Sequence, residues 1–164
     1  MNFHRQVCNT LDTEHRNSLE LLGRVEQAFA RAPRTGAGRD AGIAQLAPAF
    51  ARLIEHDIVR HFDFEERDLF PLLAEAGDGN IAALLTEEHD AMRSVAQEIL
   101  PLIRSAAATT LSDADFNVLR RGALEMVERQ VSHIQKETMA LLPLLDDLID
   151  DAADGELGLA YASS

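Results

Sequence analysis

Two stretches of this chain repeat one pattern, HFDFEERDLFPLL at residues 61–73 and HIQKETMALLPLL at residues 133–145. Each stretch is His-x-x-x-Glu, with a proline ten residues after the histidine. Four residues of an α-helix make about one full turn and rise about 6 Å, so the histidine and the glutamate share one face. The repeat therefore predicts two helices that each present an imidazole and a carboxylate side by side.

The two glutamates of this repeat are predicted to point inward. His61 aligns with Ile54 and Leu72 on its helix, and His133 aligns with Met126, so both His-Glu pairs lie on apolar faces. Burying an unpaired carboxylate costs on the order of several kcal/mol, and such a group needs a positively charged partner. Few lysines or arginines fall on these faces, which favours a metal ion as that partner.

Two further histidines, His15 and His89, also fall on apolar faces, beside Leu11 and Leu85 respectively. Each precedes the histidine of the following repeat by a nearly equal interval, so the chain consists of two copies of one helical hairpin. A single histidine on an apolar face is most simply a hydrogen-bonded core residue. Four of them at matching heights, two with a glutamate, favour one shared metal site.

Apolar residues recur at helical spacing, which predicts an all-α protein, an antiparallel up-down-up-down four-helix bundle. The expected helices cover about residues 2–31, 48–76, 80–108 and 112–150. We expect residues 35–45 to form a loop or an offset turn, and the second helix to start between Asp40 and Pro48. Residues 1–150 would form the single domain, and residues 151–164 an acidic tail that frays.

Composition and charge exclude several classes of protein. Hydrophobic residues make up 46% of the 164-residue chain, with one Tyr and no Trp, as in a helical protein rather than a sandwich. The net charge of -13 would repel a phosphate backbone, so nucleic acid is not an expected partner. No run of eighteen apolar residues and no apolar leader occurs, so we expect no membrane contact and a cytoplasmic location.

The candidate metal ligands are imidazoles and carboxylates, because the single cysteine rules out a site built from thiolates. The predicted set is His15, His61, Glu65, His89, His133 and Glu137. These groups exceed the needs of one tetrahedral ion, so two ions are expected, with the histidines as terminal ligands and the glutamates able to bridge. This donor set suits Fe, Mn or Zn, and open positions for a small ligand make iron the first choice.

At these residues the sequence resembles the hemerythrin-like, or HHE cation-binding, family of four-helix bundles with a non-haem di-iron centre. The resemblance spans nearly the whole chain and rests on His15, the 61–71 stretch, Glu88-His89 and the His133–Glu137 repeat. It implies four terminal histidine ligands and two bridging glutamates. The oxygen-carrying members have a further His and an Asp where this chain has Arg93 and Thr138, so the candidate site differs from that of a dedicated oxygen carrier.

Three functions remain open from the sequence. The first is a di-iron protein that binds or reacts with O2, NO or peroxide as a sensor or scavenger. The second is an iron-responsive regulatory or iron-storage module, and the third is a helical interaction module without metal. The Glu-x-x-His pattern of ferritin-like di-iron proteins and the His-Glu-x-x-His of metalloproteases are both missing.

Other polar residues near the predicted site receive a structural interpretation. Cys8 lies on the face of the first-helix histidine and is interpreted as a small buried hydrophobic residue. His4 is expected near the end of its helix and partly exposed, and His56 is expected outside the ligand set. Glu66 lies about 100° around the helix from its neighbour and is expected at the surface.

Overall fold

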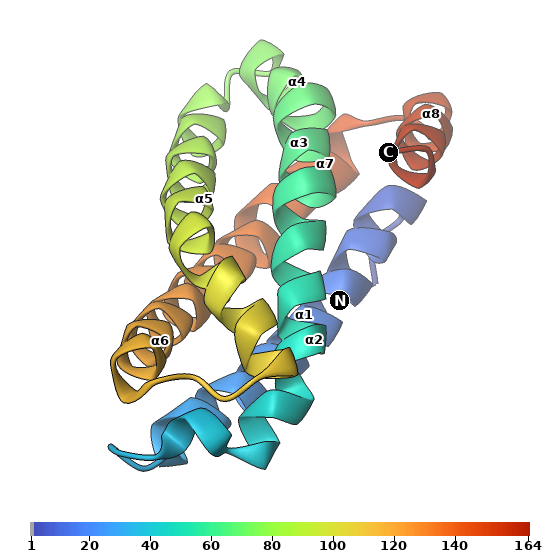
Figure 1. Cartoon of the computed structure of the whole chain (residues 1–164). Helices are drawn as coiled ribbons and strands as arrows, with labels where there is room; N and C mark the ends of the chain where they lie inside the picture. Colours follow the sequence, from blue (N-terminus) through green and yellow to red (C-terminus); the bar gives the residue numbers. More distant parts are fainter. Residues whose placement is uncertain (1) are drawn as a thin grey trace.

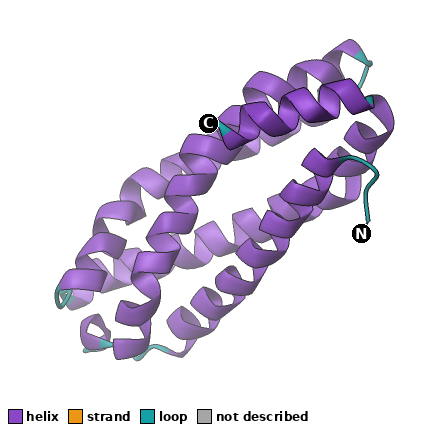
Figure 2. Cartoon of the chain, turned by 90° about the vertical axis from the view of Figure 1, so that its right-hand side faces the viewer, coloured by secondary structure: helices purple, strands orange, loops and turns teal. Residues whose placement is uncertain are grey.

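A computed structural model describes residues 2–164, which form helices and short connections without a strand. Their order and contacts define four long helical rods. The rods lie side by side (Figures 1 and 2). The first rod is α1 (Gln6–Arg31) and the third is α5 (Gly79–Ala108). The second comprises α2 (Ala41–His56), η2 (Asp57–His61), α3 (Phe62–Phe64), η3 (Glu65–Leu69) and α4 (Phe70–Glu75). The fourth comprises α6 (Asp113–Lys136), η4 (Glu137–Leu141) and α7 (Leu142–Leu148).

The rods form the predicted antiparallel bundle. Consecutive rods are joined by short connections, and each rod packs against the next, with α6 returning to pack against α1. The second connection is a tight helix-ending turn in which Gly77 adopts a φ of 97°. There the N–H of Asp78 donates to the carbonyl of Leu73 at 2.8 Å, which satisfies a helix-end carbonyl and reverses the chain.

The second and fourth rods contain wider, π-helical turns at the repeated motif. In η3 the N–H of Phe70 donates to the carbonyl of Glu65, five residues earlier, directly before Pro71. The arrangement recurs in η4, directly before Pro143. A proline has no N–H and its ring crowds the carbonyl four residues earlier, so the turn before it widens. The widened turn before each proline thus starts at the glutamate of the motif.

The helix α2 begins at Ala41, within the predicted interval from Asp40 to Pro48. A 3-10 turn, η1 (Ala37–Arg39), is followed at once by α2, so the expectation of a loop through residue 45 is wrong for residues 41–45. The carboxylate of Asp40 accepts the N–H of Ile43 at 2.9 Å and so starts the helix early.

The C-terminal segment, expected to be a frayed acidic tail, forms helix α8 (Asp151–Ala162) in the structure. Acids of α8 and α7 bind the other end of the chain. Asp154 of α8 accepts the backbone N–H groups of residues 6 and 7, and Asp146 of α7 accepts those of residues 4 and 5. These donors start α1 and lack partners within the helix, where negative charge is also favourable. The acidic residues thus cap α1 while Tyr161 is buried against the bundle.

The core consists of two apolar clusters at different heights in the bundle. One contains Leu22, Phe50, Ile99 and Phe116, and the other contains Leu11, Phe64, Leu85, Leu145 and Tyr161. On α1 and α5 the predicted ligands lie between residues of the two clusters. The polar site therefore occupies the middle of the bundle, closed by apolar layers on both sides.

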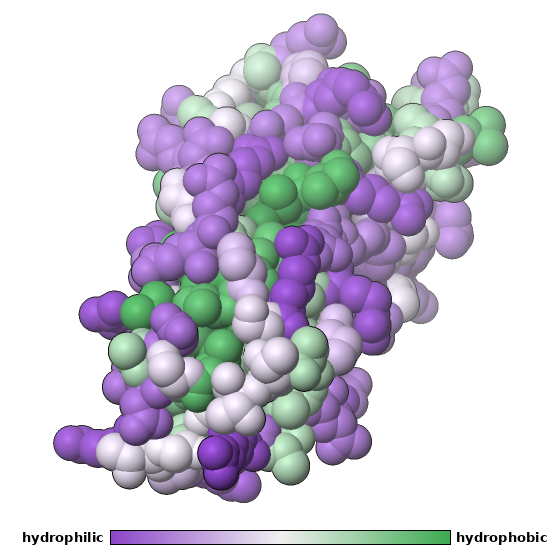
Figure 3. Space-filling model, viewed as in Figure 1, coloured by the Kyte–Doolittle hydropathy of each residue, from purple (hydrophilic) through white to green (hydrophobic). Residues whose placement is uncertain are grey.

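On the face shown in Figure 3, a band of apolar side chains runs between regions of polar ones. Among residues 2–164, no helix combines the length and the apolar character needed to cross a membrane.

Candidate metal centre

The structure brings all six predicted ligand residues together inside the bundle. Each of the four rods contributes a histidine, and both glutamates come from the first position of a π-helical turn. The exposed fraction is 0% for Glu65 and His89 and 1% for Glu137, and the other three histidines are also buried. The six residues are His15, His61, Glu65, His89, His133 and Glu137.

One group of four side chains gathers around the imidazoles of α1 and η2. His15 Nε2 lies 3.0 Å from Glu137 Oε2, and His61 Nε2 lies 3.2 Å from Glu65 Oε1. Glu137 Oε2 is also 4.0 Å from His61 Nε2. Two nitrogens and two oxygens therefore surround one point.

The second group uses the other oxygen of each carboxylate. His133 Nε2 lies 2.7 Å from Glu137 Oε1, and His89 Nε2 lies 3.3 Å from Glu65 Oε2. The two imidazole Nε2 atoms are 3.0 Å apart. Each glutamate thus directs one oxygen at each group, which is the arrangement of a bridging carboxylate.

The nitrogen and oxygen atoms of the six side chains are better arranged to coordinate metal ions than to form hydrogen bonds with one another. Both oxygens of Glu65, both oxygens of Glu137 and Nε2 of His15 are buried without a hydrogen-bond partner among the described residues. The nitrogens approach these oxygens at short distances but without hydrogen-bond geometry. Four unpartnered buried carboxylate oxygens would carry a large desolvation cost, which cations placed among them would offset.

The buried imidazoles and carboxylates shift one another's pKa values. Burial alone would lower the pKa of His89, but the carboxylates of Glu137 and Glu65 outweigh it and raise that pKa to about 9. The pKa of His61 is likewise raised, against burial, mainly by Glu65. Burial would raise the pKa of Glu137, but the imidazoles, His133 first, hold it well below its usual range. The raised pKa values of His61 and His89 favour their protonated forms, whose charge offsets that of the carboxylates beside them.

The outer nitrogens of the imidazoles are held by a second layer of polar groups. Nδ1 of His89 lies 2.8 Å from Glu66 Oε1, and Nδ1 of His133 lies 2.8 Å from Glu88 Oε2. A carboxylate at Nδ1 keeps the proton there and leaves the Nε2 lone pair free for a metal. The expectation that Glu66 belongs to the surface is therefore wrong, because its side chain is only partly exposed and contacts His89 on the adjacent rod.

The imidazoles of the first group have different outer partners. Nδ1 of His15 lies 3.0 Å from the Thr138 hydroxyl, and Nδ1 of His61 lies 3.3 Å from the Tyr161 hydroxyl. Tyr161 in turn donates to Glu14 Oε2. Sequence reasoning missed Tyr161 and Glu14 as parts of the site, although Tyr161 is the only tyrosine of the chain.

A comparison with known families agrees with this geometry. The description "Hemerythrin HHE cation binding domain" matches residues 7–145. The chain belongs to the hemerythrin HHE cation-binding family. Comparison with curated proteins finds no match. The family and the two buried His/Glu groups together identify a metal-binding protein of the hemerythrin type.

All six predicted ligands of this hemerythrin-family chain lie within the matched range, whereas α8 lies beyond it. Arg93, which stands where oxygen carriers were expected to have a histidine, bonds Glu66 at 2.8 Å and so supports the outer partner of His89. Lys136 similarly bonds Glu88. These cations hold the outer carboxylates in place and do not enter the inner groups.

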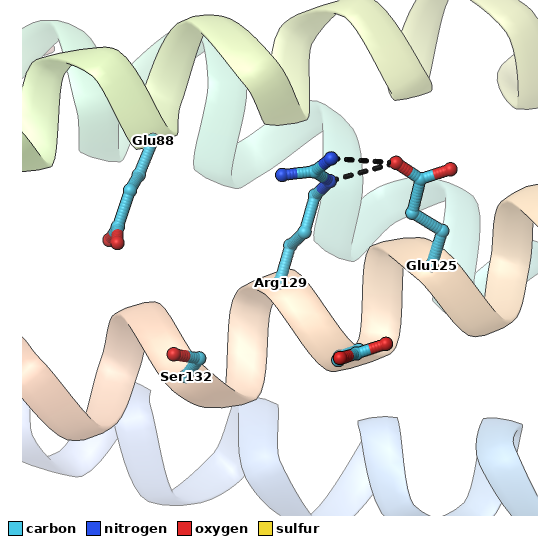
Figure 4. A pocket seen from close by; sticks show the side chains of 5 residues that line it. Glu88, Glu125, Arg129 and Ser132 are labelled. Atoms are coloured by element: carbon cyan, nitrogen blue, oxygen red, sulfur yellow. Dashed lines mark hydrogen bonds and ion pairs between the residues drawn. The ribbon is translucent and has the colours of Figure 1, made fainter.

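A surface pocket opens beside Glu88, between α5 and α6 (Figure 4). Its lining also includes Glu125, Glu128, Arg129 and Ser132. Arg129 pairs with Glu125 at 2.8 Å and leaves Glu88 directed at His133 and Lys136. Glu88 therefore separates this hemerythrin site from the solvent on the side of α6.

The remaining polar residues near the hemerythrin site lie outside the two groups. Cys8 is fully buried, and burial raises the pKa of its thiol to about 12, so it behaves as an apolar side chain. His4 is exposed and lies 3.0 Å from Asp146. His56 lies 3.5 Å from Glu14 and is not part of either inner group.

Proposed function

We propose that this hemerythrin-family protein binds two iron ions. His15 and His61 would hold one ion, His89 and His133 the other, and Glu65 and Glu137 would bridge both. The proposal rests on the orientation of the two carboxylates. Each glutamate directs one oxygen at the His15–His61 pair and the other oxygen at the His89–His133 pair. One ion could not use both pairs at once.

The donor set supports iron as the metal. Imidazole with carboxylate is a borderline-to-hard set that Fe, Mn and Zn accept, and only four protein ligands surround each position, two of them shared. Positions remain open at each ion for a small ligand. Iron in such a site supplies reversible one-electron chemistry with O2, NO or peroxide, and we propose that the protein senses or scavenges a ligand of this kind.

The protein's own residues would tune that chemistry. The outer carboxylates fix the tautomers of His89 and His133, and the two apolar clusters close the site above and below. A cavity against the first group, lined by His15, His61 and Glu137, gives a small molecule a place beside the ions.

Metal content tests the proposal directly. Protein loaded anaerobically with Fe(II), freed of unbound iron and analysed for metals should contain about two irons per chain. On exposure to air, near-ultraviolet absorption should appear. One zinc, no stoichiometric metal, or an unchanged spectrum in air would each contradict the di-iron redox proposal.

A second candidate function is an iron-responsive regulatory or storage module without redox turnover. It is favoured by the contact between His61 and Tyr161, which links a metal position to α8. Metal binding would then stabilise the docking of α8. Equal melting curves and equal proteolysis of α8 in the metal-free and the metal-loaded protein would eliminate this alternative.

A further inference from the structure

A small cavity of about 10 Å³ lies inside the bundle, against the first group of candidate ligands. This volume is roughly that needed for one water molecule or one atom of a small ligand. Its lining combines candidate ligands with residues that are not ligands. The lining residues used below are His15, His61, Asp57, Gln130, Phe62 and Ile134.

Two of the other lining residues, Asp57 and Gln130, form a buried polar pair. Asp57 begins the η2 turn and is 7% exposed, and Gln130 lies on α6 and is 3% exposed. Gln130 Nε2 donates to Asp57 Oδ2, and both residues line the cavity. The pair therefore joins the second and fourth rods next to the His15–His61 position.

The amide oxygen of Gln130 is the unusual atom of this pair. It is buried and has no hydrogen-bond donor among the described residues. Asp57 already takes the amide N–H, which leaves Oε1 as the unpartnered acceptor of a residue that lines the cavity. A buried acceptor without a donor is costly, so a molecule that donates a hydrogen bond is favoured here.

Resting on the di-iron function proposed above, we infer that this cavity selects hydrogen peroxide over O2 and NO, with Gln130 accepting a peroxide O–H and Asp57 fixing the Gln130 amide.

Hydrogen-bond chemistry explains the selection. Hydrogen peroxide has two O–H donors, so one can bond Gln130 Oε1 while the far oxygen lies toward His15 and His61. O2 and NO have no proton and leave Oε1 unpaired. A site built to receive an O–H discriminates strongly against an analogue that lacks it. Phe62 and Ile134 are the apolar part of the wall, and the remaining lining residues are Glu14, Ser18, His133 and Glu137.

The reaction with peroxide balances without a further reagent. Hydrogen peroxide accepts two electrons and two protons, its O–O bond breaks, and two molecules of water form. The two electrons come from two Fe(II) ions loaded beforehand, and the protons come from solvent.

The experiment compares Gln130→Leu with wild type in the full chain, loaded anaerobically with Fe(II). Stopped-flow oxidation by hydrogen peroxide gives a second-order rate constant, and equilibrium titration with NO gives an affinity. The variant should react with peroxide about tenfold more slowly, while its affinity for NO is unchanged or higher. Gln135→Leu, an exposed position on the same helix, is the matched control and should change neither quantity.

A second variant covers the case in which Gln130→Leu does not fold. Asp57→Asn keeps the shape of the pair and offers an amide donor to Gln130 Oε1, which should satisfy that atom internally. It should also slow the peroxide reaction about tenfold and spare NO binding. Iron content and melting temperature, measured on each protein, confirm that the metal pair is intact.

The outcomes separate the two proposals. If wild type binds two irons and both variants keep its peroxide rate, or lose peroxide and NO reactivity equally, the selection by Gln130 is overturned and the di-iron function stands. If wild type binds no stoichiometric iron, the proposed function fails and the inference fails with it.

Discussion

The hydroxyl of Tyr161 lies 3.3 Å from Nδ1 of His61, a residue 100 positions earlier in the chain. Tyr161 belongs to α8, beyond the part of the chain that matches the hemerythrin family. The same hydroxyl donates to Glu14, whose pKa is lowered by its bonds with His56, His61 and Tyr161 against the effect of burial. The C-terminal helix therefore supplies an outer partner to a candidate ligand.

Replacing Tyr161 by Phe tests this relationship. The change removes the group that orients the His61 imidazole and keeps the ring that packs in the apolar cluster. Loss of such an outer partner typically weakens metal binding by about 10–100-fold. Competition with a chelator of known affinity would measure the change, and Glu156→Gln on the exposed side of α8 serves as the control. Equal affinity in Tyr161→Phe and wild type would show that α8 does not act on the site.

Single substitutions should separate terminal ligands from bridging ones. His15 approaches only the first group, so His15→Ala should leave about one ion per chain. Glu137 places one oxygen in each group, so Glu137→Gln should reduce binding at both positions and leave less than one. Elemental analysis after reconstitution gives the counts. The bridging assignment does not survive if Glu137→Gln retains one full equivalent.

The metal-free protein should lose stability as the pH rises from about 6.5 to 9. The folded pKa of His89, about 9, lies above the unfolded value of about 6.5. Its contribution to the free energy of unfolding is therefore complete below pH 6.5 and disappears as the pH passes through 9. Melting temperatures of metal-free protein across this range measure the effect, and Glu137→Gln should flatten the curve.

The protons on the histidines also compete with metal ions for the imidazole nitrogens. Because a histidine must be neutral to bind a metal ion, metal binding below pH 9 should release protons and become tighter as the pH rises. An indicator dye in weakly buffered solution would detect the release. Proton uptake, or affinity independent of pH between 6.5 and 9, would contradict the assignment of the histidines as ligands.

Close packing between α5 and α6 depends on Gly122. A Cβ atom at this position would lie 2.2 Å from Cγ2 of Ile99. Although Ala favours a helix by about 1 kcal/mol over Gly, overpacking costs about 1–3 kcal/mol, so Gly122→Ala should be destabilising on balance. Thermal denaturation measures the difference, and Ile99→Leu, which removes the branch at Cβ, should recover part of it.

A second glycine provides the control for this prediction. A Cβ at Gly23, inside α1, meets nothing within 4 Å. Gly23→Ala should therefore stabilise the protein by about 0.5–1 kcal/mol through helix propensity alone. If both substitutions change the melting temperature in the same direction, the contact with Ile99 is not the cause.

The amino-acid sequence by itself determined the four rods and the inward face of each one. Helical periodicity has a fixed angle per residue, so the alignment of His61 with Glu65, and of His133 with Glu137, follows from counting positions. The same count placed His15 and His89 on buried faces, and the structure brings all of these residues together.

Only the tertiary structure decided which residues contact the outer nitrogens of the candidate histidine ligands. Glu66 contacts His89 across two neighbouring rods, and counting positions along one helix cannot show which residue of another helix lies opposite. Tyr161 reaches His61 because acids of the C-terminal segment cap the start of α1, a contact between the two ends of the chain. Spacing along one helix carries no information about such distant partners, and they are set by how the helices pack.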